Sequence, residues 1–116
     1  MLKEKSIFTR IMDGEIPSEM LYADDRCVVI KDINPQAPVH LLLIPKKEIP
    51  NAQEVAESDL NLMGHLMTKI PSIAKEAGVD ADGYRLIINC KSNGGQEVPH
   101  LHIHLLGGRK MKWPPG

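Results

Sequence analysis

Residues 99–106 read Pro-His-Leu-His-Ile-His-Leu-Leu. Histidines alternate here with aliphatic residues, and successive side chains of a β-strand point to opposite faces. The pattern predicts a strand from His100 to Leu106 with three imidazoles on one face and the aliphatic side chains on the other. The aliphatic face can pack on a helix, which would hold the imidazoles on a rigid surface suited to a functional site.

Three imidazoles in register favour chemistry over structure, because each half-buried ring needs its own polar partners. Zinc is one interpretation, since histidine is its commonest ligand, and His100 and His102 could converge on an ion with His40. Glu97 lies close enough in sequence to assist. The Cα atoms of His100 and His104 should however lie about 13 Å apart, which is too far for all three rings to share one ion.

Phosphoryl transfer fits the pattern better. It needs a nucleophile, a proton donor and hydrogen-bond donors around the phosphate, and imidazole can serve in each role near neutral pH. Glycines at positions 94 and 95 would expose backbone N–H groups to the same phosphate. The sequence has no acidic pair or Walker-type loop to hold magnesium, so we expect a site without metal or cofactor.

The rest of the chain predicts the framework. Ser6 can cap a short helix to about Asp13, and apolar steps of three and four predict a long helix that begins near Leu60. Pro71 predicts a kink or break in it, and His65 is expected on its surface. The remaining strands are predicted at 20–23, 27–30, 41–44 and 84–89. These elements predict an α+β domain over residues 1–116, with a mainly antiparallel five-stranded sheet whose open edges favour a homodimer.

Composition narrows the function classes. The 14 basic and 15 acidic residues give a net charge of −1, which opposes binding to a nucleic-acid backbone, and four aromatic residues are too few to stack successive bases. No apolar run reaches 18 residues, and the N-terminus lacks a secretory signal. Cys27 and Cys90 form no Cys-x-x-Cys pair, so we expect reduced thiols in a cytoplasmic protein.

The motif resembles the histidine-triad (HIT) superfamily, defined by His-x-His-x-His followed by two apolar residues. The likeness runs from about Ile7 to the C-terminus and is greatest to the Hint branch, the histidine-triad nucleotide-binding proteins. The galactose-1-phosphate uridylyltransferase branch has glutamine in place of His104, and the fragile-histidine branch differs around Trp113. The segments that resemble the Hint branch are 32–40, 44–47, 64–67, 94–96, 106–109 and 113–116.

This resemblance implies a purine nucleoside phosphoramidase that binds AMP or GMP. His102 would be the nucleophile and form a nucleotidyl-histidine, and His104 would contact the phosphate and the departing amine. His100 and His40 would complete a proton relay behind the nucleophile, and Asp32 would accept the ribose hydroxyls. The base pocket would be lined by Ile7, Phe8, Ile11, Ile30, Ile33 and Leu42. The phosphate would be held by Asn89 and by the backbone of Gly95, Gln96 and Glu97.

Several alternatives stay open. Asp32 could be a turn residue before Pro35, and Glu97 departs from the serine that many relatives carry there. By resemblance, the tail 107–116 crosses a dimer interface and brings Trp113 near the other subunit's site. The competing functions are dinucleoside polyphosphate hydrolysis and a non-catalytic nucleotide-binding scaffold.

Overall fold

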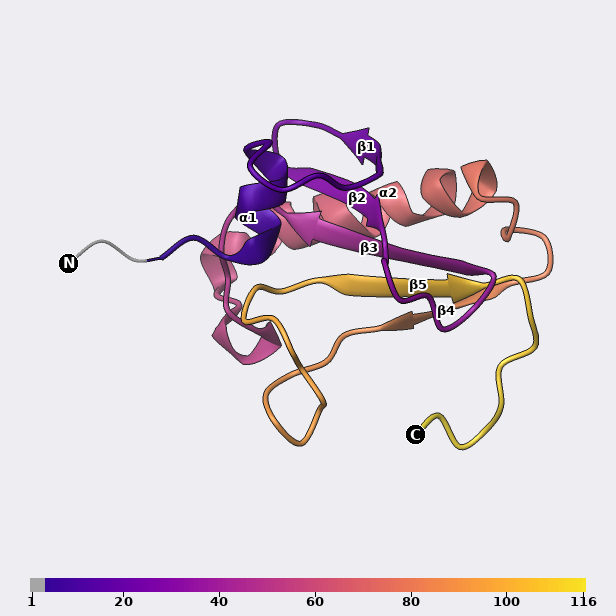
Figure 1. Cartoon of the computed structure of the whole chain (residues 1–116). Helices are drawn as coiled ribbons and strands as arrows, with labels where there is room; N and C mark the ends of the chain where they lie inside the picture. The colour runs from indigo at the N-terminus through magenta and orange to yellow at the C-terminus, as the bar shows by residue number, and fades with distance from the viewer. Residues whose placement is uncertain (1–3) are drawn as a thin grey trace.

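The computed structural model describes residues 4–116 (Figure 1). Residues 1–3 lie outside the described residues. They are part of the expected domain 1–116 and of the N-terminus that is expected to lack a secretory signal. The elements in chain order are α1 (Ile7–Met12), β1 (Met20–Ala23), β2 (Cys27–Lys31), β3 (Val39–Pro45), the 3-10 helices η1 (Ala52–Glu54) and η2 (Glu57–Asp59), α2 (Leu60–Glu76), β4 (Tyr84–Ile87) and β5 (Ile103–Gly107).

One antiparallel sheet organises the described residues. Its five strands lie in the order β1-β2-β3-β5-β4. The central pair, β3 and β5, places Leu42 opposite His104 and Leu41 opposite Leu105. The predicted α+β class, with a five-stranded antiparallel sheet, one long helix and one short α-helix, is therefore confirmed.

The sheet carries a separate apolar cluster on each face. On one face, Leu66 of α2 packs with Leu41 and Leu43 of β3. On the other face, Phe8 of α1 packs with Leu42 of the same strand. Successive residues of β3 therefore serve opposite clusters, as strand alternation requires. Figure 1 shows α2 behind the sheet and α1 in front of it, and the front face carries the site described below.

Helix α1 begins and ends where its sequence predicts. The Ser6 hydroxyl oxygen accepts the Thr9 backbone N–H at 3.1 Å, which satisfies one of the free amides of the first turn. Gly14 follows the C-cap with φ of 81°, a left-handed conformation that favours glycine. These two end signals confine the helix to a short segment against the front face of the sheet.

Strand β5 starts at Ile103, three residues later than predicted. The His100 N–H donates to the Val98 carbonyl at 2.8 Å, and the Leu101 N–H donates to the Ile49 carbonyl at 2.7 Å. Because these amides bond outside β3, the first two histidines of the motif stand on an irregular segment, and the third lies in the strand. Strand alternation alone therefore does not describe the motif.

Two further elements differ from their predictions. Strand β4 ends two residues before the predicted Asn89. Helix α2 runs unbroken through Pro71, so the predicted break is wrong. Proline removes one hydrogen bond, to the carbonyl of Met67. The half-exposed Met67 side chain lies on a helix face where water can replace that hydrogen bond.

Within residues 4–116, no helix has the length and apolar character needed to cross a bilayer.

His65 was expected on the surface of the long helix, and the structure shows that this expectation is wrong. Its side chain is 19% exposed, and its Nε2 lies 2.7 Å from the Asp24 carboxylate in the turn between β1 and β2. The contact joins α2 to the first hairpin across 41 residues of chain. Its position on the helix therefore serves the attachment of α2 to the sheet.

Candidate active site

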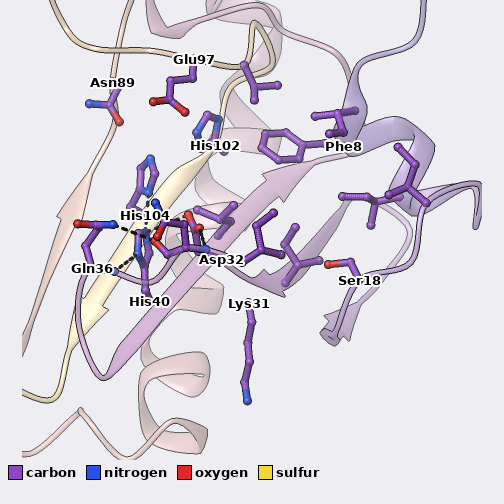
Figure 2. Close-up of a pocket in the computed structure, with 18 of the residues that line it drawn as sticks. Phe8, Ser18, Lys31, Asp32, Gln36, His40, Asn89, Glu97, His102 and His104 are labelled. Atoms are coloured by element: carbon purple, nitrogen blue, oxygen red, sulfur yellow. Dashed lines mark hydrogen bonds and ion pairs between the residues drawn. The ribbon is translucent and has the colours of Figure 1, made fainter.

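A pocket of about 520 Å³ opens on the α1 face of the sheet (Figure 2). The predicted site residues that line it are Ile7, Phe8, Ile11, Ile30, Asp32, Ile33, His40, Leu42, Asn89, Gly95, Glu97, His102 and His104. The lining residues that sequence reasoning missed are Ile16, Pro17, Ser18, Lys31, Asn34, Gln36 and Val98. Asn34 and Gln36 lie in the segment 32–40 that resembles the Hint branch, and Lys31 and Val98 adjoin predicted residues, which are the signals that could have found them. The other three carry no such signal.

His102 presents one ring nitrogen to this pocket. Its Nδ1 lies 2.7 Å from the His100 backbone carbonyl, and a carbonyl oxygen can only accept, so Nδ1 carries the proton and donates. The neutral ring therefore keeps its lone pair on Nε2. Phe8 packs edge-on against the ring at a centroid distance of 4.9 Å, which restrains its orientation. His102 thus offers a buried, oriented nucleophilic nitrogen.

The neighbouring His104 has the opposite tautomer. The Gln36 backbone N–H donates to His40 Nδ1 at 3.0 Å, so the neutral His40 ring carries its proton on Nε2. That Nε2 lies 2.9 Å from His104 Nδ1 and donates to it, which leaves the proton of His104 on Nε2. A chain of two rings anchored on a backbone amide therefore makes His104 a donor. Its ring centroid lies 4.9 Å from that of His102.

Burial keeps this histidine chain uncharged. Burial, assisted by the positive charges that His102 and His40 can carry, lowers the pKa of His104 to about 4. Burial also lowers the pKa of His40, although the adjacent Asp32 carboxylate acts in the opposite direction. Both rings are therefore neutral at pH 7, as the assigned tautomers require.

His100 lies behind the pocket and is fully buried. Its Nε2 donates to a carbonyl at the end of β3 at 2.7 Å, and its Nδ1 lies 2.5 Å from the hydroxyl of Ser6. The expected relay of His100 and His40 side chains behind His102 therefore needs correction. The His100 backbone carbonyl orients His102, and His40 supports His104. The His100 side chain instead joins α1, β3 and the segment before β5.

The Asp32 carboxylate lies at the side of the histidine chain. One oxygen accepts the Asn34 backbone N–H at 2.8 Å, which is the turn role left open by the sequence. The other oxygen lies 3.4 Å from His40 Nε2. The side chain is 20% exposed and lines the pocket. Asp32 therefore closes a turn and also offers an acceptor to a bound molecule.

The glycine loop is organised differently from its prediction. The backbone N–H groups of Gly95 and Gln96, expected on the phosphate, donate to carbonyls within the loop at 3.0 Å. The Gln96 side chain lies outside the pocket lining and donates to the Pro50 carbonyl at 2.7 Å. Asn89 lines the pocket, and its Nδ2 donates to the Gly94 carbonyl at 2.6 Å. The loop therefore forms a closed wall whose internal hydrogen bonds use these two amides.

Trp113 does not line this pocket and is 82% exposed. The tail that carries it follows β5, and the Arg85 side chain of β4 donates to the Lys112 carbonyl at 3.0 Å. Trp113 is expected near the site of a second subunit. Its position within one chain does not test that expectation, which stays a prediction.

Two groups of potential metal ligands converge among the described residues. They are Asp32 with His40 and His104, and Asp24 with Cys27 and His65. Neither is the His100 and His102 pair that the sequence suggested, because Nδ1 of His102 faces a backbone carbonyl. In the first group, the nitrogens of His40 and His104 already share a hydrogen bond. An ion there would have to replace that bond.

Comparisons with known proteins agree with this fold. A family model described as the HIT domain matches residues 13–111. An uncharacterized HIT-like protein of Synechocystis is 48% identical over 115 residues, which covers 99% of this chain and 100% of the relative. The chain belongs to the HIT domain family, which confirms the predicted superfamily.

Solved structures show the same likeness. A HIT family hydrolase from Legionella pneumophila superposes with a TM-score of 0.93 at 45% identity, covering 97% of this chain and 100% of that chain. A histidine triad protein from Clostridium difficile superposes with a TM-score of 0.90 at 44% identity, covering 97% of each chain. The fold is therefore shared over nearly the whole length.

Proposed function

We propose that this chain is a metal-independent hydrolase of the Hint branch that cleaves the P–N bond of purine nucleoside 5′-phosphoramidates. The observation that carries the proposal is the pair of opposite tautomers, a lone pair on His102 Nε2 beside a proton on His104 Nε2. Cleavage of a P–N bond needs a nucleophile at phosphorus and a proton donor at the leaving nitrogen. The similar Legionella structure is described as a hydrolase, which supports the reaction class.

The reaction proceeds in two steps, transfer of the nucleotide to His102 and hydrolysis of the nucleotidyl-histidine. The entering anionic phosphate raises the pKa of His104, whose Nδ1 takes up a proton from solvent while the His40 Nε2–H turns to the Asp32 carboxylate, 3.4 Å away. His102 Nε2 then bonds to phosphorus as the P–N bond breaks, and a proton from His104 Nε2 goes to the departing amine. Water next attacks the nucleotidyl-histidine, its proton returns to His104, and the nucleoside monophosphate leaves. His102 regains its neutral form with the proton on Nδ1, and His104 releases its Nδ1 proton to solvent when the monophosphate leaves.

The pocket supports a nucleotide on its apolar side. Phe8, Ile30 and Leu42 belong to one buried cluster beneath α1 and provide an apolar wall for a purine ring. Asp32 lies beside His40 and His104 in Figure 2, at a position suited to accept hydrogen bonds from ribose hydroxyls. Apolar, acidic and imidazole side chains therefore line one pocket, which supports the binding of a base, a ribose and a phosphate together.

A substrate panel tests this function. Adenosine and guanosine 5′-phosphoramidates are offered to the purified protein, together with a dinucleoside polyphosphate. We expect release of AMP or GMP from the phosphoramidates, and His102→Ala should abolish release while AMP still binds. A clear preference for the polyphosphate would replace this proposal with the dinucleoside hydrolase. Binding of AMP without turnover of any substrate would favour the non-catalytic scaffold.

We also propose a homodimer that pairs through the β4 side of the sheet. β4 is an edge strand, and Leu86 and Ile88 on and beside it are 36% and 43% exposed. An exposed apolar edge strand is a template for pairing with another chain. The tail with Trp113 lies on this side and would then reach the partner's site, as the resemblance implies. Sedimentation of the whole chain and of Leu86→Lys should show a dimer that the variant weakens.

A further inference from the structure

Glu97 gives one end of the pocket a negative charge. Figure 2 shows Glu97 and Asn89 beyond His102 and His104, on the side away from Phe8 and Asp32. In the proposed placement, the base lies on the apolar wall and the phosphate lies at the histidines. The group that leaves phosphorus then lies toward Glu97. The carboxylate therefore faces the leaving group, and its charge bears on which amine can occupy that end.

No charge in the pocket lining neutralises this carboxylate. Lys31, the one lysine or arginine of the lining, forms an ion pair with Glu19 at 2.8 Å and points out of the pocket in Figure 2. Among residues 4–116, Glu97 forms no ion pair or hydrogen bond with another side chain, and its residue is exposed. Its charge is therefore available to a bound molecule.

A phosphate and a carboxylate at neighbouring places repel each other. The proton that His104 takes up acts at the phosphate, and a neutral leaving group adds no positive charge beside Glu97. A leaving amine with a second, cationic group would place an ammonium between the two negative groups, where both attract it. An ammonium group donates hydrogen bonds and accepts none, and a carboxylate only accepts them, so the two groups are complementary.

We propose that Glu97 selects phosphoramidates whose leaving amine carries an additional ammonium group. This inference rests on the proposed P–N hydrolase and names the class of its leaving amine. Because the carboxylate is exposed, the expected preference is that of one solvent-screened ion pair, about 5-fold in kcat/KM.

Two matched substrates test it. One is the adenosine 5′-phosphoramidate of 1,4-diaminobutane, and the other is that of n-pentylamine, in which a methyl group replaces the terminal ammonium. The parent chain should prefer the cationic substrate about 5-fold at low ionic strength and less at high salt. Glu97→Gln should bring the ratio of kcat/KM close to one, and Glu97→Lys should invert it.

The control is Glu76→Gln, which changes the net charge equally but lies at the end of α2, on the other face of the sheet. It should keep the preference of the parent chain. A ratio that Glu97→Gln leaves unchanged would overturn the inference. An equal loss on both substrates would also overturn it, because Glu97 would then act in the chemistry itself. If the parent chain hydrolyses neither substrate, the proposed function fails, and the inference that rests on it is overturned with it.

Discussion

Two clusters in this molecule combine an aspartate with histidine, and they differ in where their hydrogen bonds go. In the pocket, Asp32 stands beside His40 and His104. On the other side of the molecule, Asp24 stands beside His65 and Cys27. Each cluster brings three potential ligand atoms within 4.8 Å of one another. Residue type and proximity alone therefore do not distinguish a catalytic cluster from a structural one.

The Asp24 cluster closes on itself. One carboxylate oxygen accepts from the Tyr22 hydroxyl at 2.7 Å and lies 2.7 Å from His65 Nε2. The other accepts the backbone N–H groups of Arg26 and Cys27 at 2.8 Å each. Burial would raise the pKa of Asp24, but these hydrogen bonds prevail and hold it well below its usual range. The partners converge on one charge, which is the arrangement of a structural anchor.

The Cys27 thiol shows the same difference in chemistry. It is fully buried, and burial together with the Asp24 charge raises its pKa to about 12. The sulfur is therefore a neutral thiol at physiological pH, and a metal would need the thiolate. The pocket cluster instead runs as a chain from the Gln36 amide through His40 to His104 and ends on a nitrogen without a protein acceptor among the described partners. That free end can serve a substrate.

The largest expected effect is on turnover at His102. His102→Ala removes the nucleophile, so we expect kcat for an adenosine phosphoramidate to fall by at least about 10⁴-fold. Stopped assays with purified protein measure the turnover, and circular dichroism measures whether the fold persists. The fold should persist, because the His102 ring itself makes one hydrogen bond, through Nδ1, among the described residues. Retained turnover would remove His102 from the mechanism.

The next effect is on stability at Asp24. Asp24→Ala leaves Tyr22, His65 and two backbone amides without their acceptor, so we expect a loss of about 2–4 kcal/mol in the free energy of unfolding. Urea titration followed by circular dichroism measures it, with the exposed neighbour in Asp25→Ala as the matched control. Specific activity of the folded protein should stay near that of the parent. A stability unchanged by Asp24→Ala would contradict the anchor.

Asp32 should show the opposite balance. Asp32→Ala removes the acceptor proposed for the ribose, so we expect AMP affinity to fall about 10-fold, the value of a lost charge-assisted hydrogen bond. Isothermal titration measures the affinity. The unfolding free energy should change less than for Asp24→Ala, because Asp32 accepts one backbone N–H and Asp24 accepts two. A larger stability loss at Asp32 than at Asp24 would reverse the comparison.

Strand alternation, the Ser6 cap and the apolar helix stripe are local signals, and they predicted most of the elements. Most of the pocket residues were instead implied by the resemblance to the Hint branch. Sequence reasoning did not predict which nitrogen of each histidine faces the pocket. That depends on the Gln36 amide for His40 and on the backbone carbonyl behind His102, and these partners meet through folding. The His65 pairing failed for the same reason, since its partner lies 41 residues away in the chain.

The smallest effects separate the clusters by pH. The pKa of His104 falls from its ordinary 6.5 to about 4 on folding, so the unfolded chain binds more protons between these values. Stability from this group is complete above about pH 6.5 and declines as pH falls toward 4. The Asp24 carboxyl has a folded pKa below its ordinary 3.8, so its contribution is present above that pH and declines below it.

Urea midpoints of the parent chain, His104→Gln and Asp24→Asn from pH 7 to 3 test this order. His104→Gln should flatten the decline between pH 6.5 and 4, and Asp24→Asn should flatten the decline below 4. The slope that remains in acid belongs in part to Glu48 and Asp59, whose pKa values are also lowered by hydrogen bonds. If His104→Gln changed only the decline below pH 4, the neutral histidine chain of the pocket would be wrong, and with it the tautomers that carry the proposed mechanism.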